Sequence, residues 1–172
     1  MSIASYLPAT VTIPDRRLKL TIRGDYPFAS RASVVFEMAK PASFPVDFAL
    51  PSGAKALRVE VNGKAQKARH QTSGFYRVWR TWSPGTRIEV VFDFPVTAHV
   101  QNGRAGRRWA AFTRGPIVLA AERSFEFPDF RDASALIEGE GERIRIKGGP
   151  RLAPYYRVGS PRGPVVTYFP VK

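Results

Sequence analysis

The feature that most constrains the fold is an alternation of apolar and polar residues that runs through the first 120 residues of the chain. In Arg17–Gly24, for example, leucine and isoleucine side chains alternate with charged or polar neighbours. Successive side chains of a β-strand point to opposite faces, so this pattern predicts strands with one buried and one solvated face. Such strands are typical of antiparallel sheets packed face to face in a sandwich.

The same alternation predicts a series of further strands, which are Ala32–Met38, Phe44–Leu50, Leu57–Val61, Phe75–Trp82, Arg87–Phe94, Thr97–Gln101, Trp109–Thr113 and Ile117–Ala121. Asn62-Gly63 is a strong hairpin signal directly after Leu57–Val61, and Ser83-Pro84-Gly85 predicts a second hairpin that joins Phe75–Trp82 to Arg87–Phe94. Pro45 lies inside an expected strand, which predicts an edge position or a bulge there. Prolines interrupt every window that could hold an amphipathic helix.

The pattern changes after Glu122. An aromatic and acidic loop is expected at Phe125–Asp132, a short strand at Glu142–Lys147 and a last strand at Val165–Phe169. We therefore predict an all-β chain, with an antiparallel, jelly-roll-like β-sandwich over residues 1–124 and a short C-terminal β extension over residues 125–172. A segment of that length is too short for a core of its own, so we expect it to pack on the sandwich as one structural unit.

The chain is strongly basic. Its 27 lysines and arginines against 14 acidic residues give a net charge of +13. Such a charge suits either an acidic protein partner or a polyanion such as nucleic acid. Arg104, Arg107 and Arg108 form the one local cluster and are the candidate polyanion site. The remaining positive charge is scattered, which favours docking on an acidic neighbour over nucleic-acid binding.

No segment of the sequence has the pattern of a targeting or membrane signal. The N-terminus lacks the basic and apolar regions of a signal peptide, and no apolar run approaches the roughly 18 residues that span a bilayer. We therefore expect no membrane partner, and a soluble protein that is either cytoplasmic or a piece of a longer chain.

The sequence contains little that could carry catalysis. It has no cysteine, which excludes disulfides, thiolate zinc sites and cysteine nucleophiles. His70 and His99 are not at metal-ligand spacing, and we expect both to be solvated. Paired carboxylates would suit a glycosidase, but most acidic residues fall on outward strand positions between basic ones, where cross-strand charge pairing is the simpler interpretation. We expect no catalytic residue, no metal and no cofactor.

The aromatic residues are more informative about binding. Tyr76 and Trp82 share the face of their strand that suits the core, so Phe75, Arg77 and Trp79 should lie on the opposite face. An exposed tryptophan on a flat sheet can stack against a sugar ring or a partner protein. The same argument applies to Trp109. The candidate carbohydrate or partner contacts are therefore Trp79, Arg77, Phe75 and Trp109, unless a neighbouring domain or the C-terminal tail covers them.

Several ordered segments resemble one known family. They are G-D-Y-P-F at Gly24–Phe28, F-A-L-P at Phe48–Pro51 with L-R-V-E-V-N-G at Leu57–Gly63, G-F-Y-R-V-W-R-T-W-S-P-G at Gly74–Gly85, F-T-R-G-P-I-V-L at Phe112–Leu119, P-Y-Y at Pro154–Tyr156 and R-G-P at Arg162–Pro164. In this order they resemble the region that follows the (α/α)6 barrel in the glycoside hydrolase family 127 group, the β-L-arabinofuranosidase-like proteins. Trp79 departs from the family pattern, because relatives carry a polar residue at its position.

The resemblance implies that the chain has no catalytic activity of its own. The family's nucleophilic cysteine, zinc-binding cysteines and acid glutamates lie in the barrel, so none of those roles transfers to a residue of this sequence. By resemblance, the chain is an accessory module that buttresses or docks on a separately encoded glycosidase barrel or another subunit, or that mediates homo-oligomer contacts. A lectin-like, carbohydrate-binding sandwich and a basic polyanion-binding domain are the alternatives.

Overall fold

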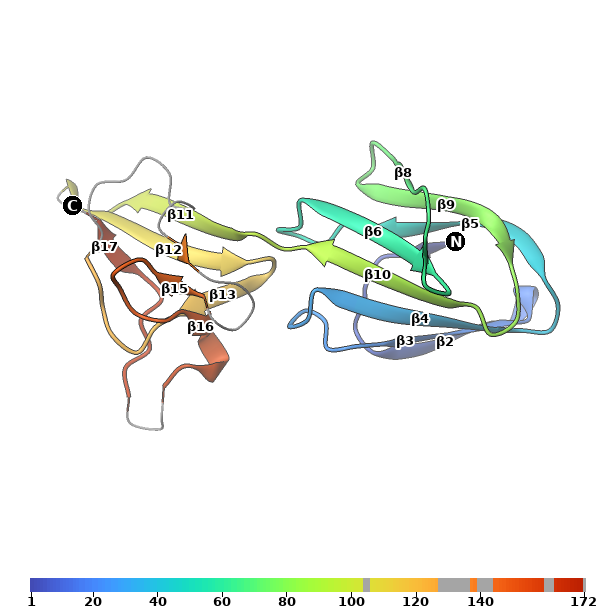
Figure 1. Cartoon of the computed structure of the whole chain (residues 1–172), viewed down its shortest axis with the longest axis horizontal. Helices are drawn as coiled ribbons and strands as arrows, with labels where there is room; N and C mark the ends of the chain where they lie inside the picture. Colours follow the sequence, from blue (N-terminus) through green and yellow to red (C-terminus); the bar gives the residue numbers. More distant parts are fainter. Residues whose placement is uncertain (104–105, 127–136, 139–143, 160–162, 172) are drawn as a thin grey trace. The chain divides into compact units, whose positions relative to one another are not determined.

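The computed structural model describes the chain except for residues 104–105, 127–136, 139–143, 160–162 and 172. The described residues form strands and turns, with short 3-10 helices at Pro14–Arg16 and Tyr155–Arg157. The predicted all-β class is therefore confirmed. The chain divides into two compact units, the N-terminal unit Met1–Phe94 and the C-terminal unit Pro95–Lys172 (Figure 1).

The N-terminal unit consists of two sheets. The first has the strand order β1 (Ser2–Ile3), β5 (Ala42–Ala49), β9 (Phe75–Trp82) and β8 (Arg69–His70). The second has the order β2 (Ala9–Ile13), β3 (Leu18–Arg23), β4 (Arg31–Met38), β10 (Arg87–Asp93), β6 (Ala56–Val61) and β7 (Lys64–Ala65). All pairings are antiparallel except that of β1 with β5.

The two sheets share one core, which makes this unit a β-sandwich. The inward residues of both sheets belong to a single buried apolar cluster. Phe36 of β4 meets Trp82 of β9 edge to face, with ring centroids 5.2 Å apart. The Trp82 indole N–H donates to the Phe44 carbonyl at 2.8 Å, so the one polar atom of this fully buried side chain is satisfied. Side chains thus interdigitate between the sheets as the alternation predicts.

The Asn62-Gly63 hairpin forms as expected between β6 and β7. Both central residues have positive φ, 49° at Asn62 and 77° at Gly63. This is the combination that a two-residue type I′ turn requires, and its twist matches that of the flanking strands. The Asn62 side chain also accepts a hydrogen bond from the Arg87 backbone at 2.9 Å, which ties the turn to β10.

The prediction of a second hairpin, across Ser83-Pro84-Gly85, is wrong. β9 pairs with β5 and β8, whereas β10 pairs with β4 and β6, so residues 83–86 carry the chain from one sheet to the other. The Thr86 hydroxyl donates to the Ser83 carbonyl at 2.7 Å, and Gly85 N–H donates to the Phe36 carbonyl at 2.9 Å. The chain does turn at Ser83-Pro84-Gly85, but the alternation of a strand does not specify which strand it pairs with.

The position of Pro45 explains how β5 tolerates it. β5 lies between β1 and β9 in the sheet order, yet β1 pairs only with Asp47 and Phe48. At Pro45 the regular ladder runs on the β9 side, where Pro45 is opposite Trp79, while on the other side the Met1 ammonium donates to the Pro45 carbonyl at 3.2 Å. Pro45 thus lies just beyond the β1 pairing, where a strand can accommodate a residue without an N–H.

The C-terminal unit begins earlier than the expected boundary at residue 125. Its main sheet contains β11 (Val96–Asn102), β12 (Arg108–Arg114), β13 (Ile117–Ala120), β16 (Ala153–Pro154) and β17 (Phe169–Val171). Residues 95–124 thus pair with the tail, because β12 adds β17 and β13 adds β16. Their shared core includes Phe112 and Phe169, with ring centroids 5.9 Å apart. The structure therefore divides the chain at Phe94–Pro95, and not at residues 124–125.

Two of the expected tail strands are shorter than predicted in the described residues. β15 (Arg145–Ile146) pairs with β14 (Ile137–Glu138). Of the expected strand before it, Ile144 is buried but is not part of a strand, and Glu142 and Arg143 lie outside the described residues. Val166 forms an isolated bridge to Ala121, and the last regular strand starts only at Phe169. Most of the loop expected at Phe125–Asp132 also lies outside the described residues.

Candidate functional site

The candidate site is the outer face of β5 and β9, meaning the side of these strands turned away from the core. Its cross-strand pairs are Ser43 with Thr81, Pro45 with Trp79, Asp47 with Arg77, and Ala49 with Phe75. Trp79 is 69% exposed, as the sequence predicted from the burial of its neighbours. The two hydroxyls of the first pair lie 2.7 Å apart and bond to each other. A single open indole is therefore surrounded by polar side chains that are already ordered.

Asp47 and Arg77 form a bidentate ion pair on this face. Arg77 Nε donates to Asp47 Oδ1 at 2.6 Å, and Arg77 Nη2 donates to Asp47 Oδ2 at 2.9 Å. The hydrogen bond from Arg77 lowers the pKa of the Asp47 carboxyl, and the same contact raises the pKa of Arg77. Both groups therefore stay ionised at neutral pH, and the planar pairing holds the guanidinium in one orientation beside Trp79.

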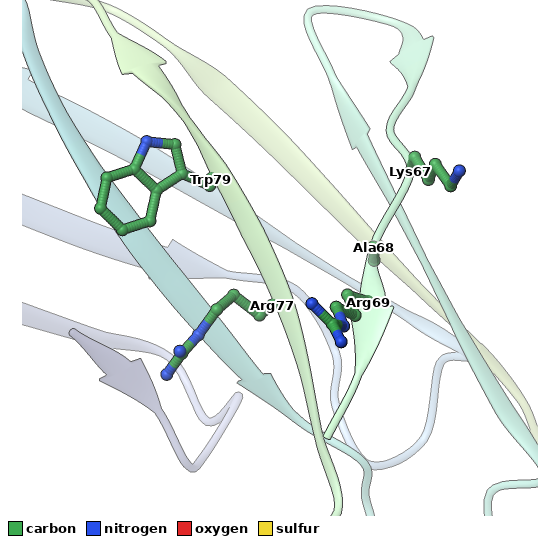
Figure 2. Close-up of a pocket in the computed structure, with 5 residues that line it drawn as sticks. All are labelled: Lys67, Ala68, Arg69, Arg77 and Trp79. Carbon is green, nitrogen blue, oxygen red and sulfur yellow. The ribbon is translucent and has the colours of Figure 1, made fainter.

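An open hollow of about 750 Å³ lies along this part of β9 (Figure 2). It is lined by Lys67, Ala68, Arg69, Arg77 and Trp79. Arg69 is directly opposite Arg77 in the pairing of β8 with β9. Figure 2 shows the Trp79 and Arg77 side chains on the same side of the β9 ribbon, Arg69 on the neighbouring β8 with its guanidinium toward β9, and Lys67 pointing away. Three cations and no carboxylate line the hollow, and the charge of Arg77 alone is balanced by Asp47.

Two residues that line the hollow, Lys67 and Arg69, were not predicted from the sequence. They belong to a polar stretch that carried no strand signal, because β8 is only two residues long. What places them at the site is the pairing of that short segment with β9. The available signal was the alternation of two cations with an apolar residue at Lys67-Ala68-Arg69.

The other two aromatic candidates, Phe75 and Trp109, are less exposed than Trp79. Phe75 lies on the same face but is half-buried, and Arg77 separates it from Trp79 along β9. Trp109 is a half-buried residue of β12 in the C-terminal unit. A Cβ atom added to Gly103 would lie 2.8 Å from the Trp109 indole nitrogen, so this ring packs against the backbone there. Trp109 is thus less open than Trp79, and its role as a contact stays a prediction.

The candidate polyanion cluster is not assembled as a site in the described residues. Arg104 lies outside them, Arg107 is exposed, and Arg108 is half-buried in β12 between Asn102 and Val171 of the neighbouring strands. The polyanion hypothesis therefore stays a prediction from the sequence.

The histidines and acidic residues occupy ordinary structural positions. His99 Nε2 lies 2.9 Å from the Thr113 hydroxyl, and the His70 ring lies 5.0 Å from that of Tyr76. Glu37 pairs across strands with Lys19 at 3.0 Å, which is the charge pairing that the sequence predicted. In the described part of the chain, no three histidine or acidic side chains are grouped as metal ligands. No helix among the described residues is long and apolar enough to cross a membrane.

The N-terminal unit is therefore a β-sandwich module with an exposed tryptophan and an ordered ion pair on one outer sheet face. The family model for the middle domain of GH127 β-L-arabinofuranosidases matches residues 1–94, which is the whole of the N-terminal unit. The chain therefore belongs to the GH127 β-L-arabinofuranosidase middle-domain family, as the ordered segments indicated. No curated protein sequence matches the chain.

Solved structures share the fold over nearly the whole chain. Ara127N-Se, a GH127 β-L-arabinofuranosidase from Geobacillus stearothermophilus T6, matches with a TM-score of 0.65 and 18% identity, covering 99% of this chain and 33% of its own. The GH127 β-arabinofuranosidase BT3674 matches with a TM-score of 0.65 and 20% identity, covering 99% and 34%. A protein described as a glycoside hydrolase matches with a TM-score of 0.62 and 19% identity, covering 94% and 34%. The chain thus spans about a third of the length of these proteins.

Proposed function

We propose that this chain is a non-catalytic accessory module that docks on the catalytic barrel of a GH127-type glycosidase. The observation that carries the proposal is the extent of the matches. The family model ends where the N-terminal unit ends, and both units together correspond to about a third of enzymes whose printed names are GH127 arabinofuranosidases. The chain therefore corresponds to the β-rich part of such an enzyme.

The charge of the chain supports docking on an acidic surface. The excess of cations gives a net charge of +13. Only some of them are neutralised locally, by ion pairs such as Lys19–Glu37, Arg58–Glu60 and Arg77–Asp47. Charge complementarity of this kind speeds association and selects the partner more than it adds affinity, and it weakens with salt.

The test mixes the purified chain with an (α/α)6 barrel polypeptide of the GH127 group encoded in the same genome. We expect a complex by size-exclusion chromatography with light scattering that weakens as the salt concentration rises. We also expect hydrolysis of an aryl arabinofuranoside by the barrel and none by the chain alone. Turnover by the metal-supplemented chain alone would refute the non-catalytic role, and the absence of a complex at low salt would refute docking.

A further inference from the structure

We infer that the hollow beside Trp79 binds an anionic saccharide, a sugar chain that carries carboxylate groups. The platform would be the Trp79 indole, and the recognition groups would be the guanidinium groups of Arg69 and Arg77. This inference goes beyond the accessory role proposed above and does not depend on docking to a barrel. It follows from three separate features of the outer face of β5 and β9.

The first feature is the indole itself. Trp79 is 69% exposed, and in the described residues its ring stacks on no other aromatic ring and its N–H has no hydrogen-bond partner. It lies opposite Pro45 in the pairing of β5 with β9. A flat, uncovered indole offers apolar area at small entropic cost, with one donor at its edge for an oxygen of the ligand.

The second feature is the charge around the ring. Within the described part of the chain, the Arg69 guanidinium and the Lys67 ammonium have neither an ion pair nor a side-chain hydrogen bond. Arg77 uses Nε and Nη2 for Asp47, which leaves Nη1 for another acceptor. The hollow thus has an uncompensated positive charge, and a guanidinium next to an open face suits a planar carboxylate.

The third feature distinguishes a saccharide from a protein partner. The centre of a protein–protein interface is enriched in aromatic residues and arginine, and its apolar groups form a contiguous, closely packed patch. Here the apolar area is small, because Pro45 alone is opposite the indole, with the Asp47–Arg77 pair on one side and the bonded Ser43–Thr81 hydroxyls on the other. One apolar ring ringed by fixed donors and acceptors matches a pyranose, which has one apolar face and hydroxyls at its rim. The hollow of about 750 Å³ is within the usual size of a small-ligand site.

The experiment titrates the full chain with tetragalacturonate and with its fully methyl-esterified form, which keeps the sugar rings but removes the charge. Binding is followed by calorimetry and by tryptophan fluorescence, to which Trp79 contributes the one indole on this face. We expect tetragalacturonate to quench the emission and to bind more weakly as salt is added, and the ester to bind several-fold more weakly still.

The variants separate stacking from charge. Trp79→Ala should lower the affinity by roughly tenfold or more, and Arg69→Gln by about two- to fivefold at low salt. The matched controls are Tyr168→Ala, an exposed aromatic of the C-terminal unit, and Arg87→Gln, an exposed cation of the other sheet; neither should change binding.

Several results would overturn the inference. Absence of binding, or binding that Trp79→Ala leaves unchanged, would remove the site. Equal affinity for the ester would remove the anionic class of ligand. Equal binding of polyphosphate that depends on Arg69 but not on Trp79 would show a general attraction to polyanions instead. Loss of barrel docking with Trp79→Ala, without saccharide binding, would assign this face to the protein partner.

Discussion

The burial of Trp82 makes a strong prediction about the stability of the N-terminal unit. This side chain is fully buried at the end of β9 and packs against Phe36 and Phe44. Trp82→Ala should destabilise the unit by about 3–5 kcal/mol for the lost volume, and the Phe44 carbonyl would lose its indole donor as well. Trp82→Phe keeps most of the volume, so its cost should be about 1–3 kcal/mol, from the lost indole hydrogen bond to a buried carbonyl.

The magnitude can be measured by urea unfolding of the full chain followed by far-UV circular dichroism. A domain of this size has about 5–15 kcal/mol of stability in total, so Trp82→Ala should remove a large and readily measured share of it. Trp79→Ala is the matched control, because it removes the same residue type from the same strand but from its exposed face. It should stay within about 0.5 kcal/mol of the parent chain. Similar losses at positions 79 and 82 would refute the inward and outward assignment of β9.

Two further predictions concern a charge pair and a glycine of the same unit. The Arg77 contact lowers the pKa of Asp47, so its stabilisation is present above the unfolded pKa of about 4 and is lost as the pH falls through the lower folded value. The urea midpoint of Asp47→Asn should therefore lie below that of the parent at pH 7 and approach it near pH 2; a constant difference would contradict this. Gly24 has φ +136°, and an added Cβ would lie 3.3 Å from backbone atoms of Arg31 and Ala32. Gly24→Ala should cost about 1–3 kcal/mol in thermal melts, more than Gly63→Ala, where φ is +77° but the space is open; the reverse order would refute it.

The candidate site was partly predictable from the alternation of inward and outward side chains along β9. Burial of Trp82 and Val78 at even positions of β9 places Arg77 and Trp79 outside, and both are there. The partner of Arg77 was not predictable, because it depends on the register that sets Asp47 opposite it. Arg69 was missed for the same reason, since only its pairing with β9 brings it to the hollow. Alternation alone did not predict the half-buried state of Trp109, because its ring packs against the backbone at Gly103.

The sequence by itself determined the all-β class, most strand positions and the type I′ turn at Asn62-Gly63, because these follow from side-chain alternation and from local backbone preferences. It also determined, through its ordered segments, the family to which the chain belongs. Only the tertiary structure decided that β9 and β10 belong to different sheets, that residues 95–124 pair with the tail, and that Arg69 lies beside Trp79. The physical reason is that alternation sets which face of a strand is buried but not which strand lies next to it, and that choice depends on packing across the whole unit.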